Sequence, residues 1–109
     1  MTWYRLHAAE RVPERVTIWS GKLGITAPTV LIREQTKRWA SCDPTGVLRF
    51  NWRIIQASMR LVDYVVVHEL VHLSHRKHTQ GFWSTLGKAM PDSENRRAIL
   101  RGLGQALNW

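Results

Sequence analysis

The sequence predicts an α+β fold, because strand patterns are confined to one part of the chain and helical patterns lie on both sides of it. Segments rich in β-branched and apolar residues fall between Pro28 and Asn51. Apolar residues at helical spacing precede this region and follow it. The stretch from Met59 to about Ser74 is apolar nearly all round, so we expect it to form a buried central helix.

Length and composition predict a single globular domain over residues 1–109. The chain has 109 residues, which is enough for one hydrophobic core and too few for two. It is 44% hydrophobic and 22% charged, as is typical of globular rather than disordered chains. No apolar run reaches the roughly 18 residues of a membrane span, and the N-terminus lacks the apolar core of a signal peptide. With Cys42 as the single cysteine, these features predict a cytoplasmic protein that is not associated with membranes.

The formal net charge is +8, which favours polyanionic partners or acidic substrates. The basic residues are dispersed, and no run of five or six like charges stands out. A solvated basic surface is the simpler interpretation, and a nucleic-acid-binding surface is the alternative.

The N-terminal half is predicted to supply one helix and the sheet. Pro13 opens a helix that Gly24 is placed to cap. The sequence Asp43-Pro44-Thr45-Gly46 is typical of a turn, so the strands on either side of it should form a hairpin. Strands are predicted over 28–34, 36–41 and 47–51, followed by a short helix or turn over 52–57.

The C-terminal part is predicted to be helical. Ser58 is placed to cap the central helix, and a second amphipathic helix ends before Pro91. Asp92 or Ser93 caps a last helix. The apolar sides of these two later helices contain Phe82, Trp83 and Leu86, and then Ile99, Leu100, Leu103 and Leu107.

The central helix carries the pattern His68-Glu69-x-x-His72. Residues four apart share one face of a helix at about 5–6 Å between Cβ atoms, so both imidazoles can bind one metal ion. Glu69 projects about 100° around the helix from His68, where it can accept a proton from a water molecule that the metal activates. Burying these groups among valines is unfavourable unless something pairs them. We therefore interpret the pattern as a metal site rather than as two buried structural histidines. The preceding valines alone favour a strand, but the motif requires a helix.

A catalytic zinc ion usually has three protein ligands and a water molecule, so a third ligand is expected after the helix. His75 and His78 are the candidates. His75 lies three residues past His72 and points away from the shared face unless the helix has already ended, whereas His78 follows a turn and can fold back. Geometry therefore favours His78 and leaves His75 as the alternative.

Several segments recur together in a known family. They are Arg38-Trp39-Ala40-Ser41-Cys42, Gly46, Phe50-Asn51-Trp52-Arg53, residues 63–73, His78-Thr79, Phe82-Trp83 and Pro91. In order and spacing they resemble the YgjP-like metallopeptidase domain, a small zincin related to SprT-like and gluzincin-type proteins. The resemblance covers roughly Gly24 to Leu103. The chain differs in having Ala40 where the family pattern has glycine, and Lys77-His78-Thr79 where it commonly has Asn-His-Ser.

The resemblance implies a zincin-like fold, with a small antiparallel sheet packed on the central HExxH helix and flanking helices. It implies one Zn²⁺ per chain with His68, His72 and His78 as ligands and Glu69 as general base. It also implies a peptide or protein substrate that binds beside an edge strand of the sheet, for which the hairpin over residues 36–51 is the expected source.

We therefore expect a zinc-dependent hydrolase, most simply a metalloendopeptidase. Two alternatives remain: a zinc-dependent hydrolase of nucleotides or phosphoanhydrides, and a non-enzymatic module that binds nucleic acid or protein. Asp63 is interpreted as a structural or helix-start carboxylate. Cys42 is interpreted as a small buried side chain, with a place beside the cleft as the alternative. By chemistry alone, the residues able to stabilise an oxyanion are Arg38, Tyr64, His75 and Arg97.

Overall fold

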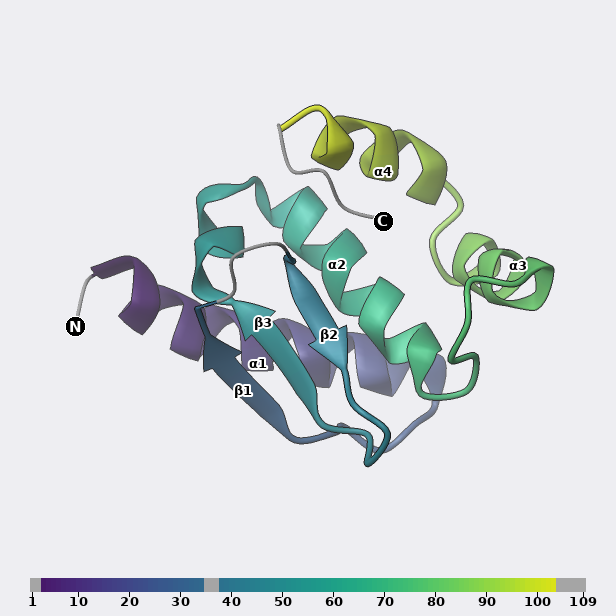
Figure 1. The fold of residues 1–109 in the computed structure, drawn as a ribbon, viewed down its shortest axis with the longest axis horizontal. Helices are drawn as coiled ribbons and strands as arrows, with labels where there is room; N and C mark the ends of the chain where they lie inside the picture. The colour runs from purple at the N-terminus through teal and green to yellow at the C-terminus, as the bar shows by residue number, and fades with distance from the viewer. Residues whose placement is uncertain (1–2, 35–37, 104–109) are drawn as a thin grey trace.

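The computed structural model describes residues 3–34 and 38–103, and it confirms the α+β class (Figure 1). Helices lie on both sides of the strands in the sequence, as predicted. The α-helices are α1 (Trp3–Leu23), α2 (Met59–His72), α3 (Gln80–Ala89) and α4 (Ser93–Arg101). The strands are β1 (Val30–Arg33), β2 (Ala40–Cys42) and β3 (Leu48–Asn51), and a 3₁₀ helix, η1 (Trp52–Gln56), follows them.

The three strands form one sheet in the order β1-β3-β2. Strands β2 and β3 pair antiparallel, with Ala40 opposite Phe50, which confirms the predicted hairpin. Strand β1 pairs parallel to β3, with Val30 opposite Leu48, so the sheet is mixed and not antiparallel throughout as expected. The first part of the predicted second strand, at 36–37, lies outside the described residues. The order of strands leaves β2 at one edge of the sheet, beside α2.

The turn between β2 and β3 is held by the carboxylate of Asp43. It accepts hydrogen bonds from the backbone N–H of Thr45 at 2.8 Å and of Val47 at 3.1 Å, and it pairs with Arg49 at 2.7 Å. Gly46 has a φ of +88°, a value that glycine adopts without strain. The predicted turn is therefore present, and its side-chain bonds hold the pKa of Asp43 below its usual range.

Helix α1 begins ten residues earlier than the predicted start at Pro13, which lies inside the helix. Its buried side explains the extension, because Ala8, Val12 and Val16 recur every four residues and are fully or almost fully buried. The predicted end is confirmed. Gly24 has a φ of +70°. The backbone N–H of Ile25 donates to the carbonyl of Ser20 at 3.0 Å, which is the bond that closes a Schellman-type helix end.

Helix α2 is the centre of the core, as predicted. Every residue from 61 to 71 is buried. Figure 1 shows the sheet lying over α1 and beside α2, with α3 and α4 on the side of α2 away from the sheet. Helix α2 therefore contacts the edge strand on one side and the two C-terminal helices on the other. Only its ends are partly exposed, so a site on α2 that reaches solvent has to lie near an end such as His72.

The C-terminal helices follow the predicted boundaries. Helix α3 ends before Pro91, and Asp92 occupies the N-cap position of α4. The Asp92 carboxylate does not cap the helix; it binds Arg60 of α2 at 2.7 Å and Arg96 at 2.9 Å. Leu103 is half exposed, and Leu107 lies outside the described residues. Among the helices of the described ranges, none combines the length and apolarity needed to cross a bilayer.

Candidate metal centre

Helix α2 brings His68, Glu69 and His72 to the same end of the core. His68 and Glu69 are each 2% exposed, whereas His72 occupies the last helical position and is half-buried. The ring centroids of His68 and His72 lie 4.9 Å apart, as expected for residues four apart on one helical face. The helix ends immediately afterwards, so the next residues are free to turn back toward this face.

His78 returns to the face of α2 that carries the other two histidines. Thr79 caps α3 by accepting a hydrogen bond from the backbone N–H of Phe82 at 3.4 Å, which sets the start of α3 directly after His78. The Nε2 atoms of His72 and His78 lie 3.1 Å apart. One nitrogen from each of the three histidines lies within 4.8 Å of the others, so the three imidazoles can hold a metal ion.

The nitrogens of His72 and His78 have the spacing of two ligands on a tetrahedral ion. Two ligands at Zn–N distances of roughly 2.0–2.1 Å and a tetrahedral angle are about 3.3 Å apart, which is close to the distance between the Nε2 atoms of His72 and His78. Burial is the largest cause of the lowered pKa of each of the three imidazoles, and a lowered pKa favours the neutral form. Neutral imidazole is the form that binds metal.

The side chain of His75 does not join the other three histidines. Its Nδ1 lies 2.9 Å from the hydroxyl of Ser74, and its ring packs against Gly81, where an added Cβ would lie 3.3 Å away. Its backbone carbonyl instead lies 3.0 Å from Nδ1 of His72, which makes that nitrogen the donor and leaves Nε2 for a ligand. Sequence reasoning missed this contact, because any residue at position 75 offers the same carbonyl.

Two aromatic rings of α3 enclose the histidines. The centroid of Phe82 lies 4.6 Å from that of His72 and 4.9 Å from that of His68. Trp83 lies 5.3 Å from His78. Phe82 is fully buried, so it excludes water from one side of the site. The predicted amphipathic helix thus supplies one wall of the site.

Glu69 is a buried carboxylate with one oxygen that has no hydrogen-bond partner. Its Oε2 lies 3.3 Å from Nδ1 of His68, whereas Oε1 is fully buried and makes no hydrogen bond. Burial raises the pKa of Glu69 to about 8, and the charge of Arg38 partly opposes this. A carboxylate in this state readily takes up a proton near neutral pH, which is the property a general base needs.

The other sequence candidates occupy different positions around this group. Tyr64 is fully buried, with its ring centroid 5.9 Å from that of His68, and burial raises the pKa of its hydroxyl. The guanidinium of Arg97 lies over the ring of Trp83, 4.6 Å from its centroid. The positive charge of Arg38, which precedes β2 in the chain, partly opposes the raised pKa of Glu69.

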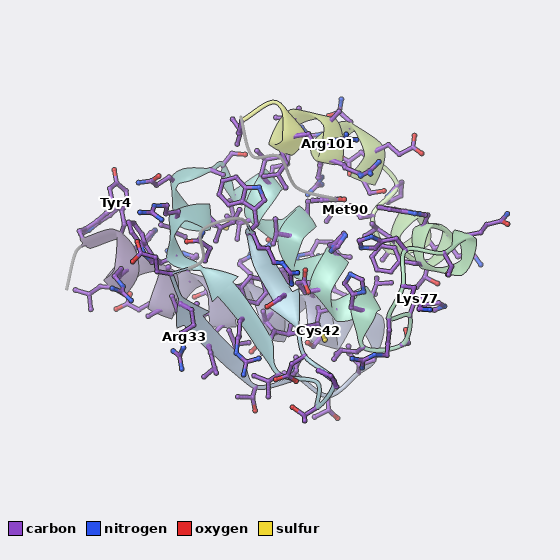
Figure 2. All side chains as sticks on the ribbon, in the orientation of Figure 1. Tyr4, Arg33, Cys42, Lys77, Met90 and Arg101 are labelled. Carbon is purple, nitrogen blue, oxygen red and sulfur yellow. The ribbon has the colours of Figure 1, made fainter. Side chains whose placement is uncertain are left out.

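Cys42 is half-buried rather than buried as interpreted from the sequence, whereas Asp63 has a structural partner. Figure 2 shows Cys42 at the end of β2 that lies beside α2. Burial, and then the nearby charge of Glu69, raise the pKa of this thiol, so it stays protonated and is a poor nucleophile. Asp63 forms a bidentate ion pair with Arg15 of α1, at 2.7 and 2.8 Å, which agrees with the structural role expected for it.

Comparison with known proteins identifies the family of this site. The family model described as "YgjP-like, metallopeptidase domain" matches residues 1–102. No curated protein matches the sequence.

Two solved structures share the fold. A metallopeptidase zymogen of Pyrococcus abyssi, abylysin, superposes with a TM-score of 0.76 at 21% identity, over 86% of this chain and 95% of that one. A metallopeptidase zymogen of Methanocaldococcus jannaschii, jannalysin, gives 0.71 at 20% identity, over 86% and 98% of the two chains. At such low identity these similarities establish the fold alone.

Proposed function

Because this chain belongs to the YgjP-like metallopeptidase domain family, we propose that it is a zinc-dependent peptidase with His68, His72 and His78 as the zinc ligands and Glu69 as the general base. One observation carries the proposal: three imidazoles converge within 4.8 Å beside a buried carboxylate that has an unpartnered oxygen. Three imidazoles with one remaining position are a donor set typical of catalytic zinc.

Different residues of the chain have different roles in the proposed reaction. A zinc ion in this site would supply Lewis acidity toward the scissile carbonyl and would lower the pKa of the attacking water toward 7. Glu69 takes the proton of that water and passes it to the leaving amine. The carbonyl of His75 holds His72 in the required tautomer, and Phe82 keeps bulk water out.

An extended peptide would bind along β2. This strand is at the edge of the sheet and beside α2, so a peptide that pairs with it would lie near the helix that carries the site. Main-chain hydrogen bonds to an edge strand hold a peptide extended without selecting its sequence. The scissile bond would then lie between β2 and the walls supplied by α3 and α4.

Glu69→Gln tests the proposal, because it removes the base and retains the shape of the side chain. We expect unchanged zinc content by elemental analysis and a fall in peptide hydrolysis of roughly 10²–10⁴-fold. Glu10→Gln, at an exposed position of α1, is the matched control and should retain activity.

Hydrolysis that survives Glu69→Gln would contradict the role of Glu69. Absence of peptide cleavage in the wild type, together with phosphate release from nucleoside triphosphates, would contradict the peptidase and favour the phosphoanhydride hydrolase.

A further inference from the structure

Helix α4 brings the guanidinium of Arg97 to the surroundings of the histidines. It lies 4.6 Å from the centroid of Trp83. The same indole ring lies 5.3 Å from His78 and 6.2 Å from His68. A single indole ring therefore lies close to this arginine and to two of the three candidate ligands.

The two neighbouring arginines of α4 have different surroundings. Arg96 donates to Asp92 at 2.9 Å and to the carbonyl of Arg60 at 3.0 Å, so it fastens α4 to the start of α2. Leu100 is fully buried and fixes the next turn. These contacts set the orientation of α4, and Arg97 is thereby directed to Trp83 at the site.

The chain carries a formal net charge of +8, and Arg97 places one of its positive charges beside the aromatic wall of the site. Positive charge at a binding site attracts anionic groups and repels cationic ones.

We propose, resting on the peptidase function above, that Arg97 is the binding site for a substrate carboxylate next to the scissile bond, so that the enzyme selects acidic peptides. A guanidinium packed over an aromatic face is held in place and partly desolvated, and its planar set of N–H donors matches a carboxylate. Lysine or arginine on the substrate at this position would meet a like charge. Arg97 is thus a specificity-determining residue.

The same arginine would act differently if it only stabilised the oxyanion. An oxyanion forms in every peptide that is cleaved, so loss of that contact would slow all peptides by the same factor. A carboxylate-binding residue affects acidic peptides and spares their amides. The ratio of kcat/KM for a glutamate peptide and its glutamine counterpart therefore separates the two roles.

The experiment uses the full chain loaded with zinc. The substrates are internally quenched peptides in which one varied residue is placed, in turn, at each position on either side of the cleaved bond. At each position the residue is Glu, Gln or Lys. Wild type should favour Glu over Gln by about 10- to 100-fold at one position, as expected for a charge-assisted hydrogen bond. Arg97→Gln should abolish this preference, and Arg97→Glu should favour Lys over Glu at the same position.

Two further comparisons complete the design. Arg33→Gln removes the same charge from β1, which Figure 2 shows well separated from Arg101 on α4, and this variant should keep the wild-type preference. Peptides with a free or an amidated C-terminus distinguish a terminal carboxylate from a side-chain carboxylate. A reversed preference of Arg97→Glu, for Lys over Glu peptides, requires a folded and active variant. A variant that fails to fold cannot show it.

A uniform loss for Glu and Gln peptides in Arg97→Gln would overturn the proposal, and so would an unchanged preference. Failure of the peptidase function itself would be recognised separately, as absence of cleavage of every peptide by the wild type. Binding is then measured without cleavage, by fluorescence anisotropy of labelled peptides with the inactive variant Glu69→Gln. The affinity of this variant for the Glu peptide should fall at least tenfold when Arg97→Gln is introduced as a second substitution. Equal affinities of the single and the double variant would overturn the inference.

Discussion

At the scale of single residues, burial acts on neighbouring groups in ways that suit a metal site. His68 and Glu69 are adjacent and equally buried, and burial disfavours the charged form of each. His68 is therefore neutral and able to bind metal, whereas Glu69 holds a proton until a positive charge is nearby. Arg38 provides part of that charge, and a bound cation would provide more. The pair is costly for a metal-free fold and suited to a metal-bound one.

His78→Ala and His75→Ala test which histidine side chain is the third ligand. In His78→Ala the affinity for zinc should fall by on the order of 100-fold or more, since a ligand contributes at least as much as the groups that orient it. In His75→Ala zinc should be retained, because the carbonyl that holds His72 is unchanged. Elemental analysis after dialysis against a weak chelator measures both. Loss of zinc in His75→Ala and its retention in His78→Ala would contradict the assignment.

The sequence predicts two of these three histidines more firmly than the third. His68 and His72 are four apart on a helix, so their geometry follows from helical periodicity alone. The position of His78 depends on where α2 ends and on the cap that Thr79 gives to α3, and both are settled by tertiary contacts. The sequence could not single out Arg97 among four residues with suitable chemistry. Its position beside Trp83 depends on the packing of α4, which local patterns do not predict.

At the scale of elements, local sequence signals predicted which segments form helices and strands, but not every length or strand pairing. Pro13 is a strong start signal, yet α1 continues through it, because burial of Ala8 and Val12 offsets the roughly 3 kcal/mol cost of an internal proline. The hairpin was predictable from its turn. The parallel pairing of β1 with β3 was not, since alternation of side chains identifies a strand but not its partner.

The ion pair between Arg15 and Asp63 is expected to fasten α1 to α2. The side chains are 22% and 12% exposed, so both charges are largely withdrawn from water. Arg15→Gln should lower the free energy of unfolding by about 1–3 kcal/mol, mainly because it leaves Asp63 with a weaker partner. Urea unfolding with a double-mutant cycle that includes Asp63→Asn measures the coupling.

Arg11→Gln is the matched control for this pair. Arg11 pairs with Glu14 on the same helix, and the two side chains are 41% and 52% exposed, so its removal should cost less than 1 kcal/mol. Equal effects of Arg15→Gln and Arg11→Gln would show that the contact between α1 and α2 does not depend on the buried pair.

At the scale of the whole molecule, the site lies where the layers meet. Helix α2 supplies the paired histidines, α3 and α4 supply the aromatic and charged walls, and the edge strand β2 lies on the other side. The ionisable side chains of His68 and Glu69 interrupt the hydrophobic core at this place. On the proposed assignment, metal binding and folding stability are therefore coupled through His68 and Glu69.

This coupling predicts how the stability of the metal-free protein depends on pH. The pKa of Glu69 is about 8 in the folded protein, against an ordinary value of 4.5 that applies to the unfolded chain. Between these values the folded state binds the extra proton, so stability falls as pH rises from about 5 to 8. His68 acts in the opposite sense below pH 6.5, because its folded pKa is lowered and the unfolded chain takes up the proton.

Urea unfolding at pH 5, 6, 7 and 8 in the presence of a chelator isolates the contribution of Glu69. Metal-free Glu69→Gln should be more stable than metal-free wild type at pH 8 by a few kcal/mol, and the difference should shrink toward pH 5 as the wild-type carboxyl becomes protonated in both states. Glu10→Gln should follow the wild-type curve, since that carboxyl is exposed. Saturating zinc should flatten the wild-type curve, because a nearby cation favours the ionised carboxylate. If the free energy of unfolding of wild type and of Glu69→Gln had the same pH dependence, burial of this carboxyl would not destabilise the fold. The coupling between the site and the core would then be absent.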